Sequence, residues 1–274
     1  MNFEEARRLA ERYVPRLRYD RAEPFELQGV GYTVYTADNI RRADNIRRAD
    51  GACRVDGACR ADGAEVKSVS CKLRFPVEPG ETVIEYAFYY DFDIQHLYDL
   101  EHVFVRVDPE GSPQGSPERN PESSPEGRIS GVLGSFHGKF LNNLLEGETE
   151  FEDTHVILYV QPGKHAFIHK PHYFRLFPDR DKCCREYAGQ DGLLIAPMFE
   201  GRISTDEAFD RQVERYIRGN YAFTPAWEFS AEYPRLPKAE EKLMPWEELD
   251  ELIVRRIAEW KRRILSLSVP QVQT

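Results

Sequence analysis

The amino-acid sequence predicts a mainly β (α+β) fold: an antiparallel β-sandwich with peripheral N- and C-terminal helices. Segments rich in β-branched and aromatic residues recur over residues 1–200, without the regular alternation of strands and helices that builds a parallel sheet. Helical periodicity is confined to the two ends of the chain. The composition, 41% hydrophobic with 14 Tyr and 16 Phe, supplies enough apolar side chains for a sizeable core.

Two inserted stretches interrupt this core, so the 274 residues are expected to form one core with an appendage. We predict a sandwich core over 1–200 with repeat-expanded loops at 37–66 and 109–125, and a helical C-terminal extension over 201–274 packed on the core. The first loop repeats a hexapeptide with an evenly spaced aspartate, and the second carries a proline at every fourth residue. A short β-helix or a cation-binding ladder of aspartates is one interpretation of the hexapeptides. We favour the other, a duplicated polar loop with too few apolar positions to bury.

The core begins with a short amphipathic helix. Asn2 can cap it while Glu5 reaches back, and apolar residues recur at helical spacing from Phe3 until Pro15 stops the helix. The first strand is expected over residues 25–35, with a bulge or bend at its glycines. Further strands are predicted at residues 69–75, 83–90, 102–108, 129–137, 155–160 and 193–198.

Two helices are expected after residue 200. Phe209, Val213 and Ile217 follow helical spacing in the first, and Pro245 opens the second. The apolar stripe of the second helix consists of Leu249, Leu252, Ile253, Ile257, Trp260 and Ile264. We expect this stripe to pack on the sheet of the same chain, because an exposed stripe of that size would promote aggregation.

Charge and cysteine content limit the classes of function. A net charge of −10 and a pI near 5.3 repel phosphate backbones and anionic membrane surfaces, so no nucleic-acid partner is expected. Neither a signal peptide nor a transmembrane segment is recognisable, since no apolar run approaches the ~20 residues that span a bilayer. The five cysteines form neither a disulfide framework nor a Cys-x-x-Cys motif, which favours a cytoplasmic location.

Carboxylates on one strand are the starting point for a candidate site. In an extended segment alternate residues share a face, so Asp99 and Glu101 stand beside Val103 on the side of the core. Burying each carboxylate without a partner would cost about several kcal/mol, so a metal, an arginine or a histidine should meet them. The candidate partners are His137 and His165, whose imidazoles lie at the ends of predicted strands and could converge on Asp99 and Glu101. Such a mixed nitrogen and oxygen shell suits Mg²⁺, Mn²⁺, Zn²⁺ or Fe²⁺ better than Ca²⁺.

These residues also carry a resemblance to a known family. The order Asp93, His96, Asp99-Leu-Glu-His-Val103, Ser135-x-His137-Gly and His155-x₇-Gly163-x-His165-Ala resembles the necrosis-inducing-protein-like superfamily, in particular its vacuolar-sorting-type branch. The resemblance implies a β-sandwich in which His96, Asp99 and Glu101 surround a divalent cation. Asp93 or Asp91 would lie upstream of them, and His137 and His165 downstream. Gln95 stands where the family has glycine and Leu100 where it has tryptophan, so membrane-lipid recognition by the family's cytolysins is not implied.

Three functions follow from such a site. In a binding module the cation shapes a loop that holds a small polar ligand, a sugar or a phosphate group; the resemblance favours this function. In a hydrolase of phosphoester or glycoside bonds, His96, Asp99 and Asp93 hold the metal while Glu101 or His165 acts as general base. The third is purely structural: a buried metal, or carboxylates paired with Arg106 or Arg74.

Other residues are weaker candidates. His102 points away from Glu101 on the strand, and His155, His169 and His172 have no recognisable partner. The adjacent Cys183 and Cys184 near His172 suggest a thiol nucleophile, but nothing specifies its general base. No nucleophile elbow, phosphate-binding loop or dinucleotide fingerprint is present.

Overall fold

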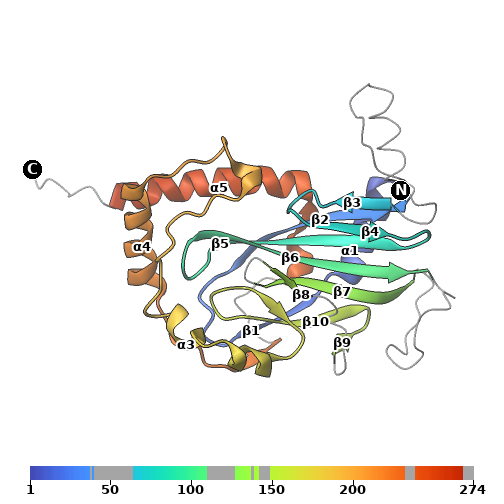
Figure 1. Ribbon diagram of the computed structural model, residues 1–274, viewed down its shortest axis with the longest axis horizontal. Coiled ribbons are helices and arrows are strands. Elements are labelled where there is room, and N and C mark those ends of the chain that lie inside the picture. Colours follow the sequence, from blue (N-terminus) through green and yellow to red (C-terminus); the bar gives the residue numbers. More distant parts are fainter. Residues whose placement is uncertain are drawn as a thin grey trace, which may run out of the picture.

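A computed structural model describes residues 1–37, 39, 64–109, 127–136, 139–141, 149–231 and 238–267. Within them, two β-sheets pack face to face, and helices and a hairpin cover the outer face of the larger sheet (Figure 1). The predicted mainly β, α+β fold class is confirmed. All of the proline-rich stretch at 109–125 except its first residue, and most of the hexapeptide stretch at 37–66, lie outside the described residues.

The larger sheet has six strands in the order β13-β2-β5-β6-β7-β8. Their bounds are β2 Leu27–Thr36, β5 Thr82–Phe92, β6 Leu97–Asp108, β7 Arg128–Phe136, β8 Lys139–Leu141 and β13 Leu243–Pro245. The register of β2 against β5 shifts between Leu27 and Gly29, a bulge at the first of the two glycines where one was predicted. β5 and β6 contain the strands predicted at residues 83–90 and 102–108 from their β-branched and aromatic residues.

The smaller sheet has the order β11-β10-β1-β12, with β9 also paired to β10. Its strands are β1 Arg16–Asp20, β9 Phe151–Glu152, β10 His155–Val160, β11 Phe167–Ile168 and β12 Phe229–Ser230. The strand pairs are antiparallel as expected, with two exceptions in the described residues: β1 pairs parallel with β10, and β13 pairs parallel with β2. Each parallel ladder is short and joins distant parts of the chain, so no local sequence pattern predicts it.

The inner face of the larger sheet packs against the smaller sheet through aromatic side chains. Phe88 of β5 meets Phe167 of β11 with ring centroids 5.0 Å apart, and the Tyr19 and Tyr90 hydroxyls are 2.7 Å apart. All four side chains are buried. This contact defines the main core and brings the β5–β6 connection beside the end of β10.

A hairpin of β3 (Ala64–Lys67) and β4 (Arg74–Val77) covers part of the outer face. Phe75 of β4 stacks edge-on against Phe104 of β6 at 5.2 Å. The predicted strand at 69–75 is wrong in its bounds: residues 68–73 form the turn, where the Ser68 hydroxyl accepts the backbone N–H groups of Ser70 and Cys71. Residues 64–66, expected in the repeat loop, belong to β3.

The helices frame the sheets. They are α1 Phe3–Tyr13, α3 Arg180–Cys183, α4 Glu207–Tyr221 and α5 Trp246–Leu267, with short 3₁₀ turns at Pro171–Leu176, Pro197–Phe199 and Ala239–Lys242. The predicted capping box at Asn2 and Glu5 is present. The strand expected at 193–198 is absent from the described structure, because Pro197 starts a 3₁₀ turn there.

Helix α5 lies against the outer face of β2 (Figure 1). Leu249, Ile253 and Ile264 are buried along its predicted stripe. At Gly31 of β2, an added Cβ atom would lie 2.8 Å from Leu249, so the helix approaches this closely only over a residue without a side chain. No helix in the described part of the chain is long and apolar enough to cross a membrane.

Candidate metal centre

Two connections face each other at one end of the sandwich. The β5–β6 connection is closed by the Asp93 N–H, which donates to the His96 carbonyl at 3.0 Å. It is joined to the β10–β11 turn by a second hydrogen bond, in which the Ile94 N–H donates to the Gly163 carbonyl at 2.7 Å. Gly163 has φ of 67°, and an added Cβ atom would lie 2.9 Å from the Ile94 side chain. Glycine is therefore required where the turns meet.

Asp93, His96 and Asp99 form the candidate metal centre. Each offers one ligand atom, and these atoms lie within 4.8 Å of one another. Asp93 and His96 come from the β5–β6 connection and Asp99 from β6, so the spacing along the chain becomes a cluster because the connection folds back on itself. Asp93 is 1% exposed and Asp99 7%, whereas His96 is partly exposed.

The ring of His96 is held in one tautomer by the backbone. Its Nδ1 lies 2.7 Å from the Tyr98 carbonyl oxygen, which can only accept a hydrogen bond. Nδ1 must therefore donate, and in the neutral ring Nε2 carries the free lone pair. Nε2 lies 3.8 Å from Asp93 Oδ1. A carbonyl that orients a histidine in this way is typical of metal-ligating imidazoles.

Lys164 pairs with Asp93 from the opposite turn. Its Nζ lies 2.9 Å from Oδ1 and 2.7 Å from Oδ2 of the carboxylate. Burial acts to raise the pKa of Asp93, but the Lys164 ammonium and, when it is protonated, the His96 ring outweigh burial and lower that pKa. Asp93 therefore already has one cation beside it, which would compete with a metal for its oxygens.

His165 is completely buried between carboxylates. Its Nδ1 lies 2.9 Å from Asp99 Oδ2, and its Nε2 lies 3.6 Å from Glu23 Oε1, within ion-pair range but beyond a hydrogen bond. Its ring stacks on Tyr90 with centroids 3.7 Å apart. Burial acts to lower the pKa of His165, but the contacts with Asp99 and Glu23 outweigh burial and raise it to about 10. This arrangement orients Asp99 and does not bring His165 into the three-residue cluster.

Glu101 adds another carboxyl group on the inner face of β6. One of its oxygens accepts the Ser135 hydroxyl of β7, whose oxygen in turn accepts the His102 backbone N–H at 2.7 Å. Burial and then the neighbouring Asp99 carboxylate raise the pKa of Glu101 to about 8, although Ser135 and His165 act in the opposite direction. Glu101 is partly exposed and does not belong to the three-residue cluster.

Other contacts account for several residues that the sequence left as alternative members or partners of the site. Asp91 hydrogen bonds with Arg256 of α5 on the outer face, so Asp93 is the upstream carboxylate in the cluster. Arg106 pairs with Glu81 at 2.6 Å, so it does not pair with Asp99 or Glu101. His155 Nδ1 contacts the Val14 carbonyl oxygen at 2.8 Å. His137 lies outside the described residues.

Sequence reasoning missed two members of the surrounding network, Lys164 and Glu23. Glu23 accepts the Gly163 N–H at 2.8 Å as well as facing His165. Lys164 adjoins the predicted His165, so a cation beside the candidate carboxylates was visible in the sequence. Glu23 lies in an irregular stretch far from the other residues and carries no comparable signal.

Comparisons with known proteins yield one distant structural neighbour. No protein-family model matches the chain, and a comparison with curated proteins gives no match. Among solved structures, it is similar to Necrosis and Ethylene inducing Protein 2 from the causal agent of cocoa's Witches Broom disease. The TM-score is 0.33 with 18% identity, over 70% of this chain and 87% of that one.

Proposed function

We propose that this chain binds one divalent cation through Asp93, His96 and Asp99, with Glu101 at the edge of the site, and uses it to hold a small polar ligand. The observation that carries the proposal is the orientation of His96. Its Nδ1 donates to a carbonyl, so its Nε2 lone pair stands beside two carboxylates. A histidine held for a purely structural reason would have no need to present this lone pair to Asp93.

The charge balance of the site supports a cation. Four carboxylates gather around the two turns, from Glu23, Asp93, Asp99 and Glu101, whereas Lys164 and His165 are the cationic partners that contact them. Even with both partners charged and Glu101 protonated, the three other carboxylates outnumber them in a largely buried place. A divalent cation would balance it.

The ligand atoms limit which metal ions fit the site. Imidazole nitrogen with carboxylate oxygen suits Zn²⁺, Mn²⁺ or Fe²⁺, whereas Mg²⁺ and Ca²⁺ prefer a shell of oxygens. The partial exposure of His96 and Glu101 leaves one side of the cation open to solvent. On that side a phosphate or sugar oxygen can replace a water ligand.

A reducing compartment such as the cytoplasm fits this function. Cys71, Cys183 and Cys184 are free thiols, and the last two have their sulfur atoms 3.6 Å apart without a bond. Free thiols in this number are typical of proteins that fold where glutathione keeps cysteine reduced.

Calorimetric titration of chelator-treated protein with Zn²⁺ and Mn²⁺ tests the cation site. His96→Gln should weaken one binding event, because the substitution removes the aligned lone pair. His172→Gln is the matched control, because that histidine is exposed and lies outside the cluster. Equal binding by wild type and both variants would refute the assignment.

Titration of inorganic phosphate and simple sugars into metal-loaded protein tests the ligand. Binding that needs the metal and disappears in His96→Gln supports the binding function. Metal-dependent release of product from phosphoesters or glycosides would instead make the protein a hydrolase, with Glu101 as the first residue to examine as base. Metal binding without either effect would identify a structural cation.

A further inference from the structure

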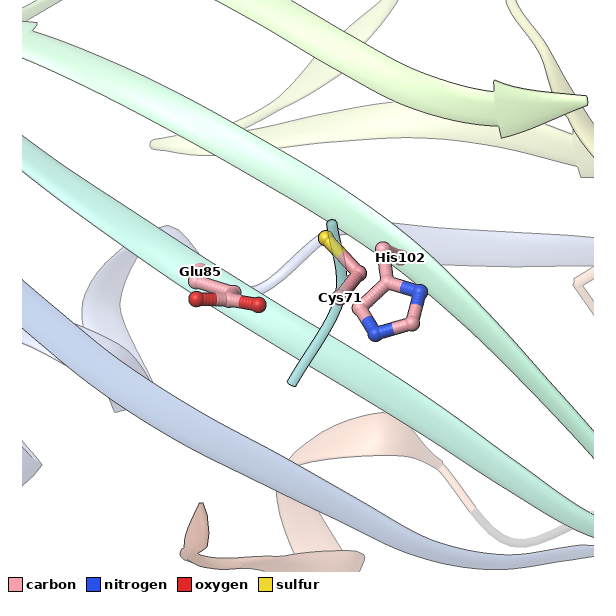
Figure 2. A group of neighbouring side chains, drawn as sticks. All are labelled: Cys71, Glu85 and His102. Carbon is pink, nitrogen blue, oxygen red and sulfur yellow. The ribbon is translucent and has the colours of Figure 1, made fainter. Parts of the chain in front are cut away.

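A second group of metal-capable side chains lies on the outer face of the larger sheet. Cys71 belongs to the β3–β4 turn, Glu85 to β5 and His102 to β6. Figure 2 shows the Glu85 carboxylate on one side of Cys71 and the His102 ring on the other. His102 directly follows Glu101 in β6, so the two residues point to opposite faces of the sheet. The outer group is therefore separate from the candidate metal centre.

The distances in this group fit a small cation. One sulfur, one nitrogen and one oxygen atom lie within 4.8 Å of one another. In a tetrahedral zinc site with these donor atoms, neighbouring ligand atoms are about 3.5 Å apart. The three side chains therefore need to move by roughly 1 Å to close around an ion.

Glu85 is a buried carboxylate that has no lysine or arginine partner in the part of the chain that the structure describes. It is 1% exposed, and no lysine or arginine of the described residues forms an ion pair with it. Two other buried carboxylates in or next to β5 differ: Glu81 pairs with Arg106, and Asp91 with Arg256. An ionised carboxylate in such a place is costly unless a positive charge meets it.

Hydroxyl groups orient Glu85 without neutralising it. Ser68 and Ser70 of the turn donate to Oε1, and Tyr35 of β2 donates to Oε2 at 2.5 Å. A carboxylate can accept about four hydrogen bonds, so one position on Oε2 stays available. Carboxylates that bind a metal are commonly oriented by hydrogen-bond donors of this kind.

The second, independent sign of a ligand comes from His102. The residue is 6% exposed, and its Nε2 is buried without a hydrogen-bond partner in the described structure. A buried ring nitrogen without a partner loses its hydrogen bond with water and gains nothing in return. A metal ion would satisfy Nε2 and balance the charge of Glu85 at once.

We propose that Cys71, Glu85 and His102 form a second metal site, selective for Zn²⁺, that clamps the β3–β4 turn to the larger sheet. Thiolate, imidazole and carboxylate together favour zinc over Mg²⁺ or Ca²⁺. Binding exchanges the Cys71 S–H bond for a metal–sulfur bond and releases the proton to solvent. Cys71 is the partly exposed member, so the ion enters past it, and a water molecule takes the fourth position.

Cobalt substitution tests the proposal on the full-length protein. Chelator-treated wild type titrated with Co²⁺ should show a thiolate-to-cobalt charge-transfer band. Asp93, His96 and Asp99 cannot produce this band because none of them has a sulfur atom, although cobalt bound there can add ligand-field bands. Cys71→Ser should lose the charge-transfer band and one equivalent of bound metal. Cys183→Ser and His96→Gln should both keep the band, and the second of these separates this proposal from the inner site.

The proposal is overturned if Cys71→Ser keeps the band at the intensity of wild type, or if wild type shows no band at saturating Co²⁺. Circular dichroism and a melting curve establish that Cys71→Ser is folded. If it is not, X-ray absorption of zinc-loaded wild type decides the question. One sulfur with imidazole scatterers around part of the zinc is expected, and a spectrum without sulfur overturns the site.

Discussion

Replacing Lys164 by methionine separates a salt bridge from a shared cation site. The substitution keeps the length of the side chain and removes its charge. The Lys164 side chain is 11% exposed and that of Asp93 is 1% exposed, so the variant leaves a buried carboxylate without its ammonium partner. Breaking a buried ion pair costs about 3–5 kcal/mol. At about 2–4 °C per kcal/mol for a chain of this size, the melting temperature in chelator should fall by about 6–20 °C.

Added Zn²⁺ should restore much of this loss. In wild type, metal at a hundredfold excess over Kd adds about 2.7 kcal/mol of stability. The gain should be larger in Lys164→Met, because the ammonium no longer competes for Asp93. The assay is thermal unfolding of both proteins with chelator and with Zn²⁺. Lys170→Met is the control, since Lys170 pairs with the exposed Glu150 and its loss should be small and independent of metal. Equal metal-induced shifts in wild type and Lys164→Met would refute the reasoning.

Two further predictions concern the packing of the helices. Gly31→Ala should lower the free energy of unfolding, measured in urea, by about 1–3 kcal/mol, because the new Cβ atom meets two α5 side chains at 2.8 and 3.2 Å. Gly219→Ala is the control within α4: nothing lies within 4 Å of the new Cβ atom, so the free energy of unfolding should rise by about 0.5–1 kcal/mol. Arg256→Gln should cost about 1–3 kcal/mol by leaving the buried Asp91 unpaired. Arg211 pairs with Glu207 on the surface, so Arg211→Gln should change the free energy of unfolding by no more than about 0.5 kcal/mol. Similar losses in Arg256→Gln and Arg211→Gln would contradict the account.

Local patterns were sufficient for α1, β5 and β6. The capping residues of α1 and the β-branched and aromatic runs of β5 and β6 predict these elements, because a helix cap and a run of strand-forming residues are decided by near neighbours. Alternation along the strand predicted that Asp99 faces the core. It failed at residues 69–75, where the serine hydroxyl of Ser68 organises a turn although apolar residues alternate.

Contacts between distant segments could not be predicted in this way. The parallel pairing of β1 with β10 joins residues more than a hundred positions apart, and its short strands have a weak pattern. The partners of His165 and the outer group around Glu85 come from several segments that meet only after folding. Glu85 itself interrupts an apolar strand, and that single carboxylate was a signal that sequence reasoning did not use.

The most direct test of the inner cation site is the melting temperature of wild type and Glu101→Gln, each with and without chelator, together with their metal content. Glu101→Gln keeps the shape of the side chain near Ser135 and removes the charge. The account predicts that chelator lowers the melting temperature of wild type, and that this effect and the metal content both shrink in the variant. A wild type without bound metal, and an equal loss in the variant with and without chelator, would contradict it and leave the carboxylates as a structural network.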